Sequence, residues 1–195
     1  MFGRITAAAG LVFLSPVIAM AAIAVLLETG SPILFRQTRI GRKGRPFQLL
    51  KFRSMRSGSG GPQITSSHDR RITRVGTILR RFKVDEVPQL WNVIRGDMNL
   101  VGPRPHPVSN LELFGEGIPY YSLRSAVRPG ITGWAQIRLG YANNLEEETE
   151  KMRFDLYYIK HLSFWLDVRI LFDTVKIVMF GQGSQSVGAY RDAAA

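Results

Sequence analysis

The stretch that decides the fold is ITAAAGLVFLSPVIAMAAIAVLL, residues 5–27, which has no charged residue over 23 positions. A straight α-helix of this length reaches about 34 Å, enough to cross the hydrocarbon core of a bilayer. Buried core helices and the apolar regions of signal peptides are usually shorter, and the basic residues that follow would oppose export. The stretch therefore predicts a membrane helix whose C-terminal side is cytoplasmic.

A proline interrupts this helix at Ser15-Pro16. Proline removes a backbone hydrogen bond and clashes with the preceding turn, so it kinks or breaks the helix, and Ser15 can bond a carbonyl left free at the break. Two interpretations remain: a kinked transmembrane helix, or a re-entrant hairpin that enters and leaves by one face. Proline is common in membrane-spanning helices, which favours the kinked span. Arg4 mildly favours having both ends on the cytoplasmic side.

Basic charge is concentrated in the next part of the chain. The net charge is +11, and residues 31–83 hold 14 basic residues against one acid, whereas residues 84–195 hold 11 basic and 13 acidic residues. Such a block is built to face anions: nucleic acid, anionic lipid headgroups or phosphorylated substrates. The chain has no cysteine, which excludes disulfides, thiolate metal sites and cysteine nucleophiles, and its three histidines are scattered.

The remaining pattern predicts a mainly α domain with a small β element. Residues 32–55 read as a β-hairpin that turns between Gly41 and Gly44, and the prolines of residues 101–107 require an extended stretch. Apolar periodicity predicts helices over residues 69–82, 84–94 and 146–161. Residues 57–67 are expected to form a flexible loop. The apolar residues 164–180 predict a buried core helix, favoured slightly over a helix in the membrane interface.

Two adjacent carboxylates, Asp85 and Glu86, lie in the sequence KVDEVP, residues 83–88. Taken alone, the motif favours a structural interpretation, in which Asp85 is a helix N-cap and Glu86 complements the helix dipole. The basic surroundings favour phosphoryl chemistry instead, because one carboxylate can attack phosphorus or hold Mg²⁺ while cations neutralise the developing charge. The candidate cations are Lys51, Arg53, Arg80, Arg81, Lys83 and Arg104, the last fixed between Pro103 and Pro105.

These motifs, with several others in order along the chain, resemble those of the bacterial sugar transferases, also called monotopic phosphoglycosyl transferases. The shared blocks are LSP (14–16), SPILFRQTRIGRKGRPF (31–47), KFRSM (51–55), RITRVGTILRR (71–81), DEVPQLWNVIRGDMNLVGPRP (85–105), RPGITGWAQI (128–137) and FDLYYIKHLSFWLDVRILFDT (154–174). The resemblance implies transfer of a sugar-1-phosphate from a nucleotide diphosphate sugar, with a UDP-sugar expected, to undecaprenyl phosphate. The motif PRPHP and the Gly188-Ala189-Tyr190 ending resemble members that prime exopolysaccharide synthesis with glucose or galactose.

The resemblance also implies roles for individual residues. Asp85 matches the nucleophile that forms a covalent aspartyl phosphosugar, and Glu86 completes the dyad, with both carboxylates near Mg²⁺. The other matches are phosphate-binding Lys51, Arg80 and Arg104, the nucleotide-sugar motif Pro103-Arg104-Pro105, and the membrane helix break Ser15-Pro16. Because the family break turns the helix back to the cytoplasmic face, the resemblance favours the re-entrant hairpin over the span. Family members usually carry a basic residue and an aspartate before the apolar stretch, where this chain has Gly3, as expected either of a truncated N-terminus or of a chain cut from a longer member with extra membrane helices.

We therefore predict an α+β fold, mainly α, at the cytoplasmic face of a bacterial inner membrane. Residues 1–30 form a re-entrant membrane helix hairpin, residues 31–180 a compact cytoplasmic catalytic domain with interfacial helices, and residues 181–195 a flexible tail. The expected partners are undecaprenyl phosphate, a UDP-sugar and membrane lipid, with no nucleic acid. Two alternative functions remain: a non-catalytic basic membrane scaffold that holds anionic lipid, and a nucleic-acid-binding module, for which the chain has no recognised motif.

Overall fold

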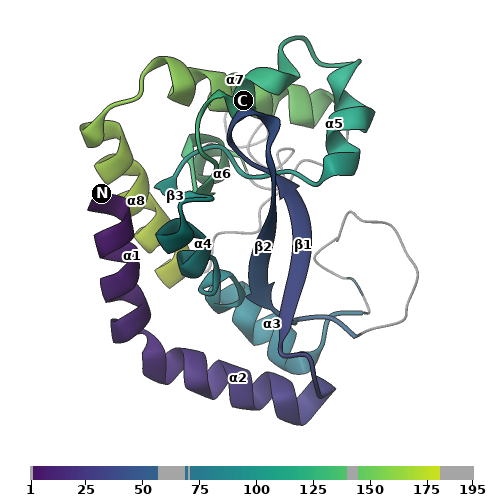
Figure 1. Cartoon of the computed structure of the whole chain (residues 1–195), viewed down its shortest axis with the longest axis vertical. Helices are drawn as coiled ribbons and strands as arrows, with labels where there is room; N and C mark the ends of the chain where they lie inside the picture. The colour runs from purple at the N-terminus through teal and green to yellow at the C-terminus, as the bar shows by residue number, and fades with distance from the viewer. Residues whose placement is uncertain (1, 57–68, 70, 140–144, 181–195) are drawn as a thin grey trace.

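The computed structural model describes residues 2–56, 69, 71–139 and 145–180. The loop predicted at residues 57–67, the tail at 181–195 and the Gly188-Ala189-Tyr190 ending lie outside these residues. Helices α1 (Phe2–Phe13) and α2 (Ser15–Thr29) form an L along one side and one end of the molecule (Figure 1). The other helices and two small sheets lie within this angle, which confirms the mainly α class with a small β element.

The apolar stretch breaks where the sequence predicted. Helices α1 and α2 meet at an angle of 63°. The Ser15 hydroxyl donates to the Val12 carbonyl at 2.8 Å, and Pro16 lies in the first turn of α2, where its missing N–H leaves no bond unmade. Within the described residues, no single helix has both the length and the apolar composition to cross a bilayer, whereas this bent pair has both when taken together.

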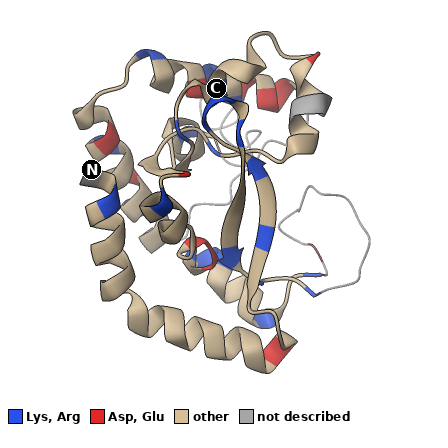
Figure 2. Cartoon of the chain, viewed as in Figure 1, with Lys and Arg blue, Asp and Glu red and all other residues tan. Residues whose placement is uncertain are grey.

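Small residues of the bent pair face the protein and large ones face outward. Ala7 packs with Val93 and Met98, and Ala21 and Val25 pack with Phe52 and Leu79. The large apolar side chains Val12, Phe13 and Leu27 are 76%, 84% and 83% exposed. Charges lie only near the two ends of the pair, at Arg4 and Glu28 (Figure 2). Large apolar side chains that are exposed together on the surface in this way are typical of contact with a membrane or a partner.

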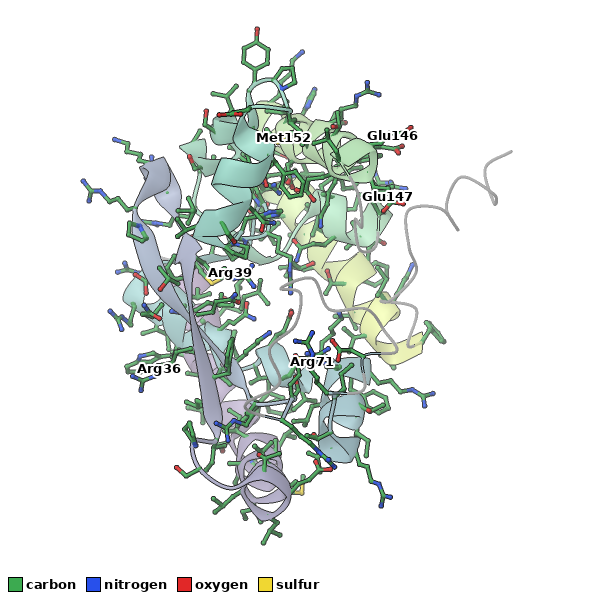
Figure 3. The ribbon with its side chains drawn as sticks, turned by 90° about the vertical axis from the view of Figure 1, so that its right-hand side faces the viewer. Arg36, Arg39, Arg71, Glu146, Glu147 and Met152 are labelled. Atoms are coloured by element: carbon green, nitrogen blue, oxygen red, sulfur yellow. The ribbon has the colours of Figure 1, made fainter. Side chains whose placement is uncertain are left out.

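The predicted hairpin is confirmed. Strand β1 (Leu34–Ile40) pairs antiparallel with β2 (Pro46–Phe52), and a turn at Arg42–Gly44 joins them. Figure 3 shows Arg36 and Arg39 on opposite faces of β1, with Arg36 directed outward. A second sheet, which the sequence did not predict, consists of β3 (Asn99–Val101) parallel to β4 (Gly130–Thr132). A Cβ at Gly130 would lie 2.1 Å from the Gly102 nitrogen, so this contact requires glycine.

The helix predicted over residues 69–82 begins later. Thr73 is the N-cap of α3 (Arg74–Arg81), since its side chain accepts from the Gly76 N–H at 2.8 Å. The helix predicted over 84–94 is two elements, a 3₁₀ turn at Val84–Glu86 and α4 (Gln89–Arg95), which are separated at Val87-Pro88. The sequence missed three elements: α5 (Val108–Gly115), a 3₁₀ helix at Tyr121–Ala126 and α6 (Trp134–Arg138).

The two C-terminal helices have the predicted bounds to within one residue, α7 at Leu145–Lys160 and α8 at Phe164–Phe180. The prediction that α8 is a core helix is wrong. Ile170 is its one buried residue, while Trp165, Phe172 and Phe180 are 77%, 62% and 74% exposed. A helix whose apolar residues surround its whole circumference can bury only one stripe on a surface, and α8 packs along that stripe on α6, β3 and β4.

Glu28 ties the bent pair to α3, because its two carboxylate oxygens accept the backbone N–H groups of Arg74 and Val75 at 2.8 and 2.9 Å. These groups open α3 and have no partner within that helix. We expect Glu28→Ala to lower the free energy of unfolding by about 0.5–2 kcal/mol, the range for a lost N-terminal cap. Denaturation in detergent micelles measures this, with the exposed Glu116→Ala as the control; equal stability of the two variants would contradict the capping role.

Candidate active site

The carboxylate pair lies in a sharp turn between α3 and α4. Lys83 adopts the left-handed conformation (φ 56°, ψ 18°), which ends the helical path of α3 and starts the 3₁₀ turn that carries Asp85 and Glu86. A side chain with a Cβ adopts this conformation only when the surrounding structure imposes it. The interpretation of Asp85 as an N-cap is wrong, because the cap positions here are Lys83 and Pro88 and neither carboxylate caps a helix.

Asp85 is buried, with 6% of its surface exposed. Its Oδ1 atom is buried and has no hydrogen-bond partner among the described residues. Burial, and then the negative charge of Glu86, raises the pKa of Asp85 to about 6, although nearby cations act in the opposite direction. A buried carboxylate with a free oxygen and a raised pKa is a stronger nucleophile than an exposed one, since less solvent must leave it before it reacts.

The surroundings of Glu86 lower its pKa, whereas those of Asp85 raise its pKa. Burial would raise its pKa, but the Arg104 guanidinium, 2.5 Å from Oε1, outweighs burial and holds the pKa at about 2. Adjacent carboxyl groups whose pKa values are driven apart are suited to different tasks in one reaction. Glu86 therefore stays ionised at neutral pH, while Asp85 changes its protonation state near pH 6.

The predicted cations converge on this dyad from separate elements. Lys51 lies on β2, where burial lowers its pKa to about 8 and the charge of Asp85 opposes the shift. Arg80, in the last turn of α3, donates from Nε to the Ser54 hydroxyl at 2.9 Å, and its charge also acts on Asp85. Three cations from distant parts of the chain thus act on one pair of carboxylates, an arrangement that suits an anionic substrate.

The proline-flanked arginine is held by the loop that carries it. Pro103 and Pro105 are buried, and the Arg39 guanidinium donates to the Pro105 carbonyl at 3.0 Å. Arg39 is the inward-facing arginine of β1 (Figure 3). The hairpin therefore supports the loop from one side and leaves Arg104 directed at Glu86.

A cavity of about 290 Å³ adjoins the dyad on the side of the helix break. Its polar lining includes Glu86, Arg104, Lys151 and Gln136, and its apolar walls come from α4, β4, α6, α8 and Leu14. Leu14 is the residue between α1 and α2, so the cavity extends from the dyad to the point where the apolar pair bends. Ser15 and Pro16 directly follow Leu14 in the chain, and neither of them lines the cavity.

A cluster of buried charges behind the cavity was missed by the sequence analysis. Arg124 donates to Glu148 at 2.8 Å and to Asp155, and all three side chains are buried. His106 accompanies them: its Nδ1 lies 2.9 Å from the Tyr121 hydroxyl, and burial lowers its pKa well below the ordinary value. The spacing of the residues could have revealed this cluster. The buried positions of α7, residues 148, 151, 152, 155 and 158, recur every three or four positions and therefore share one face of the helix.

The dyad offers two carboxylates to a cation. Across the described residues, no group of three or more histidine, aspartate or glutamate side chains converges in a way that could hold a metal ion. Mg²⁺ is commonly bound by one or two carboxylates completed by substrate phosphates and water. The buried, unpartnered Oδ1 of Asp85 and the ionised Glu86 beside it fit that donor set.

Comparisons with known proteins identify relatives of this chain. A family model described as bacterial sugar transferase matches residues 1–181. The chain is 43% identical over 173 residues to the UDP-N-acetylgalactosamine-undecaprenyl-phosphate N-acetylgalactosaminephosphotransferase of Aeromonas hydrophila, which covers 88% of this chain and 41% of the relative. It is 45% identical over 165 residues to the UDP-glucose:undecaprenyl-phosphate glucose-1-phosphate transferase of Caulobacter vibrioides, covering 83% of this chain and 62% of the relative.

A third relative is similar in length to this chain. The exopolysaccharide production protein PSS of Rhizobium leguminosarum bv. phaseoli is 40% identical over 183 residues, covering 89% of this chain and 91% of the relative. The chain thus spans about two fifths to three fifths of the first two relatives and most of the third.

Proposed function

This chain belongs to the bacterial sugar transferase family, and on that basis we propose that it transfers a hexose-1-phosphate from a UDP-sugar to undecaprenyl phosphate, the priming step of exopolysaccharide assembly. The names of two relatives support the reaction class and that of the third supports the pathway. The observation that carries the proposal is the buried carboxylate of Asp85, which has one oxygen free and lies among Lys51, Arg80 and Lys83.

In the first half-reaction, the sugar phosphate is transferred from the donor to Asp85. The free Asp85 oxygen attacks the sugar-linked phosphorus of the UDP-sugar, a phosphorus–oxygen bond forms to the carboxylate, and the bond to UMP breaks. UMP leaves with the bonding electrons. Lys51, Arg80 and Arg104 stabilise the charge that develops on the phosphoryl oxygens. Glu86 stays ionised and holds the Arg104 guanidinium in place.

In the second half-reaction, the sugar phosphate is transferred from Asp85 to the lipid acceptor. A phosphate oxygen of undecaprenyl phosphate attacks the same phosphorus, the bond to Asp85 breaks, and the carboxylate is regenerated as the diphosphate-linked lipid sugar forms. Two substrates that use one carboxylate in turn give ping-pong kinetics. We propose that Mg²⁺, held by Asp85 and Glu86 together with phosphate oxygens, supplies charge neutralisation when bound.

We propose that α1 and α2 form a re-entrant hairpin at the cytoplasmic face of the inner membrane. The 63° bend supports this, as do the charges confined to the two ends of the pair and the exposed apolar side chains of α8. The cavity that joins Leu14 to Glu86 would then place the dyad at the depth of the lipid headgroups. At that depth a water-soluble donor and a lipid acceptor both reach one carboxylate.

The assay for this function is UMP release by the purified protein with undecaprenyl phosphate and a panel of UDP-sugars. We expect UMP from UDP-glucose or UDP-galactose, with sustained turnover only when the acceptor is present. No UMP from any UDP-sugar, together with lipid binding that Asp85→Asn leaves intact, would support the scaffold alternative. A salt-dependent gel shift with oligonucleotides, together with recovery in the cytosolic fraction, would support the nucleic-acid alternative.

The pH dependence of the first half-reaction follows from the Asp85 pKa of about 6. Only the ionised carboxylate attacks, so the rate should rise with pH, reach half its plateau near pH 6 and stay level above about pH 7. Glu86→Gln removes the neighbouring negative charge, so its half-plateau should fall to a lower pH even though the maximum rate is reduced. Rapid-quench measurement of UMP across pH 4.5–8.5 tests both. A profile for Glu86→Gln with an unmoved midpoint would show that another group controls the rate.

A further inference from the structure

Lys151 is a buried cation without a salt bridge. It lies on α7 and is 7% exposed. The acidic residues one turn to either side, Glu148 and Asp155, are both bonded to Arg124. Within the described part of the chain, no carboxylate lies within salt-bridge distance of the Lys151 ammonium and no hydrogen bond to it is present. Buried ammonium groups are normally paired, so the fold holds this charge for a reason other than its own stability.

The ammonium belongs to the wall of the cavity beside the dyad. Lys151, Arg104 and Glu86 all line it. Burial lowers the pKa of Lys151; the charges of Glu148 and Asp155 oppose this, and those of Arg124 and Arg104 add to it. The acids at the start of α7, Glu146 and Glu147, lie on the outer side of the helix (Figure 3). An anion in the cavity would therefore give the Lys151 ammonium the direct ionic contact that Glu148 and Asp155, which are bonded to Arg124, do not make.

A second unpartnered polar group lines the same cavity. Gln136, on α6, donates from Nε2 to the Ile131 carbonyl at 2.9 Å. That bond fixes the orientation of the amide and leaves Oε1, which is buried and has no hydrogen-bond partner within the described residues. A carbonyl oxygen can only accept, so its natural ligand partner is a hydroxyl or N–H group. One molecule that satisfies both groups carries a phosphate and a hydroxyl a short distance apart.

We propose that Lys151 and Gln136 bind the donor, a nucleoside diphosphate sugar, with the ammonium on a phosphate oxygen and Oε1 accepting a hydroxyl of the same molecule. The assignment rests on the proposed function above. It favours the donor over the lipid acceptor because a polyprenyl phosphate carries a phosphate but has no hydroxyl on its chain to meet Gln136. Arg104, which is bonded to Glu86, and Lys151 then hold the diphosphate between the dyad and α7.

The principal variant is Lys151→Met, which keeps the length of the side chain and removes its charge. The control is Lys160→Met, an exposed lysine of the same helix. We expect Lys151→Met to weaken the binding of UDP about 10- to 100-fold, as for the loss of one charged hydrogen bond, and to raise the KM for the UDP-sugar by a similar factor. The KM for undecaprenyl phosphate and the behaviour of Lys160→Met should be unchanged.

Thermal unfolding separates binding from structure. Removing an unpaired buried charge should leave the Tm equal or higher, whereas a lysine that stabilises the fold would give a lower Tm. UDP binding equal to that of the wild type would overturn the proposal. So would a raised KM for undecaprenyl phosphate with unchanged UDP binding, because that result would assign the site to the acceptor.

A measurement on the wild-type side chain does not depend on how Lys151→Met folds. Reductive ¹³C-methylation followed by NMR titration reports the pKa of each lysine, and the Lys151 signal is assigned by its loss in Lys151→Arg. Adding UDP should raise the Lys151 pKa, since a phosphate stabilises the charged form, and an unmoved titration would contradict the site. UDP binding needs no turnover. A protein that binds UDP through Lys151 but releases no UMP would therefore disprove the proposed function and leave the site intact.

Discussion

Asp85→Asn is expected to reduce sugar-phosphate transfer at least about 1,000-fold, because an amide oxygen does not displace UMP from the donor. The same variant should be more stable than the wild type. Asparagine carries no charge to bury, and the Asp85 carboxylate is buried with one oxygen unpartnered. Increased stability with lost activity is typical of residues retained for chemistry.

The gain in stability should depend on pH in a defined way. The folded-state pKa of Asp85 is about 6, above the ordinary value of 3.8, so ionisation destabilises the folded state. Relative to Asp85→Asn, the wild type should lose stability as pH rises from about 4 to 6 and then keep a constant deficit of about 1–3 kcal/mol. Denaturation at pH 4 and pH 7.5 measures this. An Asp85→Asn protein that is folded and retains the wild-type rate would disprove the nucleophile.

Arg124→Met should produce the largest loss of stability in the catalytic part of the chain. Arg124 is 7% exposed and bonds both Glu148 and Asp155, which are buried. Its removal leaves two buried carboxylates without the guanidinium that is hydrogen-bonded to both of them, and breaking a buried ion pair in this way costs about 3–5 kcal/mol. We expect a marked fall in Tm and reduced recovery of folded protein.

The control is Arg153→Met, an exposed arginine on α7, the helix that carries Glu148 and Asp155. Combining Arg124→Met with Glu148→Gln and Asp155→Asn should recover a large part of the lost stability, because the uncompensated charges are then gone. A Tm for Arg124→Met no lower than that of Arg153→Met would show that the cluster contributes nothing to folding.

Local patterns predicted much of the fold. Alternating residues and a glycine turn give the hairpin of β1 and β2, and apolar periodicity gives α7 and α8 to within a residue. The parallel pairing of β3 with β4 could not be predicted in this way. It joins three-residue strands that are distant in the sequence, and it depends on close backbone approach at Gly102 and Gly130 rather than on a side-chain pattern.

The candidate site, like the fold, was predictable from the sequence only in part. Asp85 and Glu86 were proposed as the reactive pair from their motif, and the cations that act on them in the structure were proposed from the sequence as well. The unequal protonation of Asp85 and Glu86 could not be predicted from the sequence. It depends on the turn at Lys83 that buries Asp85 and on the contact of Arg104 with Glu86. Lys151 and Arg124 read as ordinary surface charges in the sequence. Their role follows only from the faces of α7 and of the 3₁₀ helix at Tyr121–Ala126 that tertiary packing buries.

The most direct test of the account is the mass of the peptide that contains Asp85. Protein mixed with UDP-glucose and no lipid acceptor, quenched within one turnover and digested, should contain this peptide with one added hexose phosphate. The adduct should disappear when undecaprenyl phosphate is added and should be absent from Asp85→Asn. Release of UMP only when the acceptor is present, with no modified peptide at any time, would contradict the covalent intermediate and indicate direct transfer between the two substrates.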